Sequence, residues 1–176
     1  MLVVRHVEDP LACLRDPCEL MLHEGPAPEK GTWFSRVIMR QRLRVLASPA
    51  YLRVKGAPRR LSDLADHEIL GWKRPRQALD TWPLLAGGTL KVSPWFVSPD
   101  FSLIRAIASQ GGGLLLGPQS PFLGEPDADP LVPVLEDEIG SDHVFRASSP
   151  SPIQSDPRTR TVLEQIQRLL ESFPEE

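Results

Sequence analysis

The residues best suited to bind a small molecule follow the ends of two predicted strands. Ser98 and Asp100 come directly after the β-branched and aromatic stretch 91–97, and Gln119 follows the apolar run 114–116. In open α/β sheets, ligands bind at the carboxyl ends of the strands, where helix N-termini present free N–H groups. Asp100 is itself negative, so it is either the cap of the next helix or a contact to a polar ligand group. Gln119 offers an amide that can both donate and accept hydrogen bonds.

The sequence offers no recognisable catalytic or metal-binding pattern. The four histidines are scattered along the chain without the spacing of a metal site. The glycines at 111–113 follow a predicted helix and have no Lys-Ser/Thr pair behind them, so they do not form a phosphate-binding loop. No nucleophile elbow and no cysteine–histidine pair can be identified. We therefore expect no enzyme activity, no cofactor and no bound metal.

Charge and hydropathy argue against nucleic-acid-binding, membrane-spanning and secreted classes of protein. A net charge of −3 and a sequence pI of about 5.8 argue against this chain alone binding a polyanion such as DNA. No apolar run approaches the roughly 20 residues that cross a bilayer. Charge appears already at Arg5, too early for a secretory signal. We expect a cytoplasmic protein without membrane contacts, in which Cys13 and Cys18 are free thiols.

A strand–helix–strand unit must position the candidate residues. The stretch 91–97 suits a strand, N-cap residue types follow it, and apolar residues recur at helical spacing from 103 to 108. The glycines at 111–113 end the helix, because glycine adopts the left-handed conformation without a Cβ clash. The run 114–116 has the length of a buried strand. Such a crossover predicts parallel strands with a helix on one face.

The rest of the chain also alternates between strands and helices, which indicates the α/β class. Strand 2–7, helix 10–15 with Asp9 as its cap, and strand 18–22 predict a second crossover of the same kind. The other predicted elements are strands at 32–39, 41–47, 68–72, 131–135 and 143–147, helices at 49–55 and 62–65 and from 157 onward, and a hairpin of 82–85 with 89–92.

Several segments, in this order, resemble the effector-binding domain of LysR-type transcriptional regulators. The resemblance rests on CELMLHEGP at 18–26, LRVLASPAYL at 43–52, PRRLSDLADH at 58–67, the segment 98–118, and LVPVL at 131–135. These segments are spread over nearly the whole chain. The segments at 43–52 and 58–67, with the separation that they have here, are the most specific part of the resemblance.

The resemblance implies a type 2 periplasmic-binding-protein-like fold, in which two α/β lobes enclose an interlobe ligand cleft. Residues 1–40 and 145–176 would form lobe I, and residues 41–144 would form lobe II. The effector contacts that the resemblance implies are Glu8, Asp9, His23, Ser48, Ser98, Asp100 and Gln119. Ser48 precedes Pro49, so it is either an effector contact or a plain helix cap. The carboxylates Glu8 and Asp9 would favour a polar or amine-bearing effector over a simple anion.

The implied function is regulatory. The domain would bind a small-molecule effector and signal through homodimer contacts to a DNA-binding domain. The family's winged helix-turn-helix, its linker helix and the first strand and helix of the effector domain have no counterpart in this sequence. We therefore expect an incomplete lobe I, DNA binding only through a domain absent from this chain, and a fragment produced by design, by a misplaced start codon or by real truncation. The alternative is a solute-binding protein of a transporter, which shares the fold.

Overall fold

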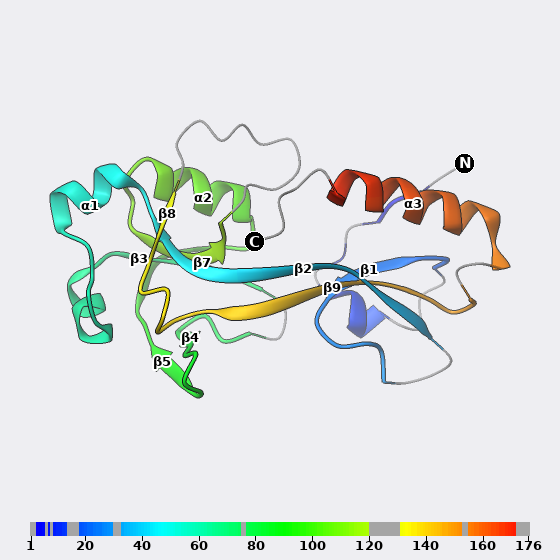
Figure 1. Ribbon diagram of the computed structural model, residues 1–176, viewed down its shortest axis with the longest axis horizontal. Helices are drawn as coiled ribbons and strands as arrows, with labels where there is room; N and C mark the ends of the chain where they lie inside the picture. Colours follow the sequence, from blue (N-terminus) through cyan, green and yellow to red (C-terminus); the bar gives the residue numbers. More distant parts are fainter. Residues whose placement is uncertain are drawn as a thin grey trace. The chain divides into compact units, whose positions relative to one another are not determined.

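The computed structural model describes residues 3–5, 7, 9–13, 18–29, 33–74, 77–119, 131–152 and 155–171 (Figure 1). The chain divides into two compact units. Unit 1 consists of Met1–Gln41 and His143–Glu176, and unit 2 consists of Arg42–Asp142. Two strands, β2 (Phe34–Ala47) and β9 (Ser141–Ser149), contribute residues to both units.

Unit 2 contains the predicted crossover. Strand β6 (Pro94–Ser98) leads into helix α2 (Phe101–Ser109), which leads into strand β7 (Leu114–Pro118). Strand β3 (Ile69–Trp72) lies between β6 and β7 and pairs in parallel with both. The end of β2 runs antiparallel to β7 and also to β8 (Val132–Val134). The parallel strands and their crossover helix are therefore confirmed.

Alternating side chains on these strands supply the apolar core on both faces of the sheet. Leu46 and Leu115 face α2 and pack against Phe101 and Ile104, whereas Leu43 and its alternating neighbours face the opposite side. That opposite side is covered by helix α1 (Pro49–Lys55), the 3₁₀ helix η2 (Leu61–Asp66) and the hairpin of β4 (Thr81–Pro83) with β5 (Thr89–Lys91).

Unit 1 is built around an antiparallel strand pair. Strand β1 (Met21–Glu24) pairs with β9, and the 3₁₀ helix η1 (Pro10–Cys13) precedes it. Helix α3 (Pro157–Glu171) closes the described chain, and the Asp156 side chain caps it by accepting hydrogen bonds from the backbone N–H groups of Arg158 and Thr159. In the described parts of the chain, no helix is long and apolar enough to cross a membrane.

Two predictions for unit 1 were wrong. The described residues of 2–7 are not in a strand, and β1 runs antiparallel to β9, so no second parallel crossover forms there. The two strands predicted at 32–39 and 41–47 are instead one strand of 14 residues, β2, which begins at Phe34 and continues into unit 2. The physical reason is that strand pairing is decided by partners far apart in the sequence, which local patterns do not reveal.

Candidate functional site

The polar residues predicted around the crossover gather at one edge of the unit 2 sheet. Because β3, β6 and β7 are parallel, their carboxyl ends lie together. Trp72 at the end of β3 is the register partner of Ser98 at the end of β6, and Gln119 directly follows the end of β7. We call this region the carboxyl edge. It is where this architecture places ligands.

The predicted polar residues at α2 serve as helix caps. Asp100 Oδ1 accepts hydrogen bonds from the backbone N–H groups of Ser102 at 2.9 Å and Leu103 at 3.3 Å. Ser98 Oγ in turn accepts from the Asp100 N–H at 3.0 Å. The Asp100 carboxylate therefore occupies the positive end of α2 and competes there with an anionic ligand. These contacts support the role of Asp100 as a helix cap over a role as a ligand contact.

Two arginines that sequence analysis missed lie at the carboxyl edge. Arg105, only 6% exposed, donates from Nη1 to the backbone carbonyls of Pro118 at 3.4 Å and Gln119 at 3.0 Å. Arg74, 8% exposed, lies 5.1 Å from the centre of the Trp72 ring. Buried guanidinium groups raise the local positive potential and present donors suited to carboxylates and other acceptors. The signal that could have revealed Arg105 is its place on the apolar face of α2.

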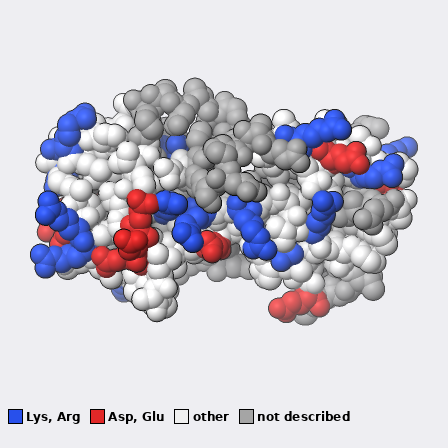
Figure 2. All heavy atoms as spheres, in the orientation of Figure 1, with Lys and Arg blue, Asp and Glu red and all other residues white. Residues whose placement is uncertain are grey.

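A third arginine, Arg44, carries an unsatisfied donor. Its Nη1 pairs with the carboxylate of Glu136, whereas its buried Nε has no hydrogen-bond partner among the residues that the structure describes. Arg44 is the register partner of Gly117 and alternates with Leu46, so it projects on the α2 face of the sheet. An unmade buried hydrogen bond costs about 1–3 kcal/mol, so this donor favours a bound acceptor. Figure 2 shows basic and acidic side chains close to one another on the visible face of unit 2.

Ser48 does not belong to the carboxyl edge. Strand β2 runs antiparallel to β7, so its last residues lie at the opposite edge of the sheet. Ser48 is 2% exposed, and its Oγ accepts from the Tyr51 N–H at 3.2 Å as the N-cap of α1. It therefore cannot contact one small ligand together with Ser98 and Gln119. The contacts support the alternative of a plain helix cap.

The candidates in unit 1 that the structure describes form hydrogen bonds within that unit. His23 is buried, with Nδ1 3.2 Å from the Glu24 carbonyl oxygen and Nε2 2.8 Å from Ser148 Oγ. Burial lowers the pKa of His23, and the Arg146 charge lowers it further. Asp9 Oδ1 caps η1 by accepting from backbone N–H groups of that helix. Glu8 lies outside the described residues.

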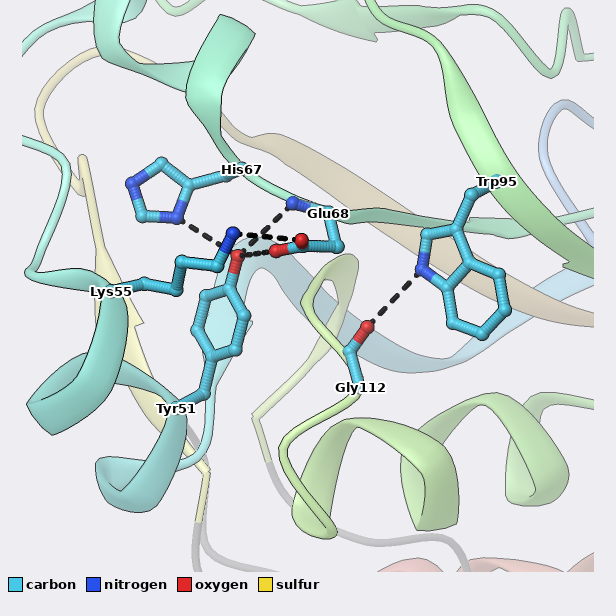
Figure 3. Close-up of polar contacts among 6 residues, drawn as sticks. All are labelled: Tyr51, Lys55, His67, Glu68, Trp95 and Gly112. Atoms are coloured by element: carbon cyan, nitrogen blue, oxygen red, sulfur yellow. Dashed lines mark hydrogen bonds and ion pairs between the residues drawn. The ribbon is translucent and has the colours of Figure 1, made fainter.

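A further polar cluster, also missed from sequence, lies at the edge where Ser48 is found (Figure 3). The Tyr51 hydroxyl donates to Glu68 Oε2 at 2.7 Å and lies 3.0 Å from His67 Nδ1. Lys55 Nζ donates to Glu68 Oε1 at 2.8 Å. Hydrogen bonds from Lys55 and Tyr51 lower the pKa of Glu68 to about 2, while burial and Glu68 raise the pKa of Tyr51 to about 12. These groups hydrogen-bond to one another and tie α1 to the start of β3, which is a structural role.

Comparison with protein-family models gives one match over nearly the whole chain. Residues 2–171 match the family described as LysR substrate binding domain. The transcriptional regulator CrgA of Neisseria meningitidis serogroup B is 31% identical over 134 residues, which is 73% of this chain and 44% of CrgA. The chain therefore spans less than half the length of this relative.

Solved structures of regulators show the same fold. The CrgA regulatory domain from N. meningitidis superposes with a TM-score of 0.70 at 28% identity, covering 89% of this chain and 76% of that domain. Full-length AphB, a virulence activator of Vibrio cholerae, gives a TM-score of 0.66 at 21% identity, covering 91% of this chain and 53% of AphB. The effector domain of AmpR from Pseudomonas aeruginosa gives 0.62 at 15% identity, covering 89% and 74%.

Proposed function

The chain belongs to the LysR substrate-binding domain family, and we propose that it is the effector-sensing domain of a LysR-type transcriptional regulator. The relative matched in sequence is a transcriptional regulator, which favours this function over the solute-binding protein that we considered from sequence. It also favours a sensor over an enzyme. The implied type 2 periplasmic-binding-protein-like fold is shared by the matched regulatory domains.

We propose that the carboxyl edge of unit 2 supplies part of the effector site. The observation that carries this proposal is the buried Nε of Arg44, which lacks an acceptor among the described residues and lies on the face of the sheet that α2 covers. A ligand with a carboxylate or another strong acceptor would satisfy this donor. Arg105 and Arg74 strengthen the preference for an acceptor. The amine-bearing effector expected from Glu8 and Asp9, and the placement of the effector between two lobes, stay predictions.

A thermal-shift screen with a panel of small carboxylates tests the effector site. We expect at least one carboxylate to raise the melting temperature of the wild type, because a ligand bound only by the folded state stabilises it. The same compound should stabilise Arg53→Gln, in which an exposed arginine of α1 is changed, but not Arg44→Gln. Equal stabilisation of both variants would place the site elsewhere.

DNA binding is proposed only for a longer protein. The chain carries a net charge of −3, so the purified domain should not bind operator DNA at physiological salt. The size of the native gene product, measured by immunoblot in the source cell, tests the link to DNA. A band well above 19.6 kDa supports a regulator with a DNA-binding segment, whereas a band at 19.6 kDa contradicts it.

We further propose a homodimer that covers the free edge of β6. This strand ends the sheet order, and it exposes Trp95 at 59% and Val97 at 42%. The Trp95 indole donates to the Gly112 carbonyl at 3.2 Å, which holds the ring against the turn after α2 (Figure 3). Analytical ultracentrifugation should show dimers at micromolar concentration that Trp95→Ser weakens. A purely monomeric wild type would contradict the dimer.

A further inference from the structure

Unit 1 contains a groove that none of the predicted site residues lines. It lies between the start of β2 and helix α3 and has a volume of about 350 Å³. This volume is in the range of pockets that hold small molecules. Its lining residues are Phe34, Ser35, Arg36, Pro152, Arg160, Leu163, Glu164 and Gln167.

The base of the groove is apolar. Leu163 of α3 is 2% exposed, and Pro152 also belongs to the lining. Phe34 at the start of β2 is large and 46% exposed, although it lines the groove. Covering such a ring with the apolar body of a ligand would remove apolar surface from water and stabilise the complex.

Two guanidinium groups lie in the same lining. Arg36 has no ion-pair partner among the described residues, and Arg160 has only a loose one, with its Nε 3.9 Å from Glu164 Oε1. That separation exceeds hydrogen-bond distance, so the Arg160 donors are not committed to Glu164. Two cations against one carboxylate leave the groove with a net positive charge.

The polar wall beside these cations is fixed in place. Ser148 Oγ is 2.9 Å from Ser35 Oγ and 2.8 Å from the buried His23 Nε2. Ser35 also lines the groove, and its half-buried side chain alternates with those of Phe34 and Arg36 along β2. These hydrogen bonds fix the start of β2, the strand that carries Phe34 and Arg36.

We propose that this groove is a second ligand site, which takes a small organic anion with an apolar body. The apolar base and Phe34 would contact the body of the ligand, and Arg36 and Arg160 would bind its anionic group. The site lies wholly within unit 1 and shares no residue with the carboxyl edge. It is therefore independent of the effector site proposed above.

Two fluorescent probes that share an aromatic body but differ in charge test the proposal. The probes are 8-anilinonaphthalene-1-sulfonate, an anion, and N-phenyl-1-naphthylamine, which is neutral. In the double variant Arg36→Gln/Arg160→Gln we expect the anion to bind roughly fivefold more weakly, while the neutral probe changes less than about twofold. The matched control Arg168→Gln alters an exposed arginine of α3 outside the groove and should bind both probes as the wild type does.

A space-filling variant tests the location separately. Gln167→Trp places a large ring in the groove from the half-buried face of α3 and should abolish the binding of both probes that is seen in the wild type. Circular dichroism and urea unfolding establish that each variant is folded. Unchanged anion binding by the double variant, or unchanged probe binding by folded Gln167→Trp, would overturn the proposal and leave the carboxyl-edge proposal untouched.

Discussion

Tyr51 is the only tyrosine of the chain, so the ionisation of its phenol can be followed by absorbance in the intact protein. Its hydroxyl donates to Glu68 Oε2 at 2.7 Å and accepts from the Glu68 backbone N–H at 3.0 Å. Because its single proton is used on the carboxylate, His67 Nδ1, 3.0 Å away, must act as a donor. Burial first, and Glu68 second, raise the pKa of Tyr51 to about 12.

The perturbation is a pH titration of the wild type and of Glu68→Gln. The native phenol should titrate near 12, against the ordinary pKa of 10 that the unfolded chain should show in denaturant. Since the folded pKa is the higher one, the stabilisation is fully present below pH 10 and is lost as pH rises towards 12. Glu68→Gln removes the nearby carboxylate but not the burial, so the pKa should fall and yet stay above 10.

The matching stability measurement uses Tyr51→Phe, which removes the hydroxyl and retains the buried ring. The Glu68 N–H and His67 Nδ1 would lose their acceptor, and the Glu68 carboxylate would lose a donor. Partial rescue by water limits the expected loss in urea unfolding at pH 7 to about 1–3 kcal/mol. Glu164→Gln, in unit 1, is the control and should leave the phenol titration unchanged. A native phenol that titrates at 10, together with a Tyr51→Phe variant as stable as the wild type, would refute the reasoning.

Substitutions at four other positions test the fold. Gly113→Ala should lower stability by roughly 2–4 kcal/mol in urea unfolding, because its φ is +139° and a Cβ would lie 2.4 Å from the Glu68 carbonyl oxygen. Gly111→Ala, at φ +86° with open space around it, should lower stability only by the backbone strain of about 1–2 kcal/mol. Equal losses of stability in Gly113→Ala and Gly111→Ala would contradict the steric argument. Ser48→Ala should cost about 1 kcal/mol as a lost N-cap, and Ser48→Thr should recover much of it in the same assay. Burial lowers the pKa of His23, so the stability contributed by its neutral form is present above pH 6.5 and is lost as pH falls through the folded pKa. His23→Gln should flatten this loss of stability at acid pH. An NMR titration that gives His23 a pKa of 6.5 or higher would contradict the prediction.

The features that could be predicted from the sequence are those determined by neighbouring residues. Asp100 was identified as a cap residue and the glycines from Gly111 as the end of α2, because both depend on the backbone geometry of a few adjacent positions. The parallel crossover followed from the same local signals. The hairpin of β4 and β5 was likewise predicted from its turn residues.

Tertiary structure alone decided which distant residues meet. Strand β1 pairs with β9, more than a hundred residues away, and no local pattern specifies that partner or its antiparallel direction. The sequence placed Ser48 after a strand, but only the antiparallel pairing of β2 with β7 puts it at the edge opposite Gln119. Arg105 becomes a buried donor because α2 packs against the end of β7. Caps and turns are short-range interactions that a segment satisfies by itself, whereas registers, buried charges and ligand sites depend on the packing of the whole chain.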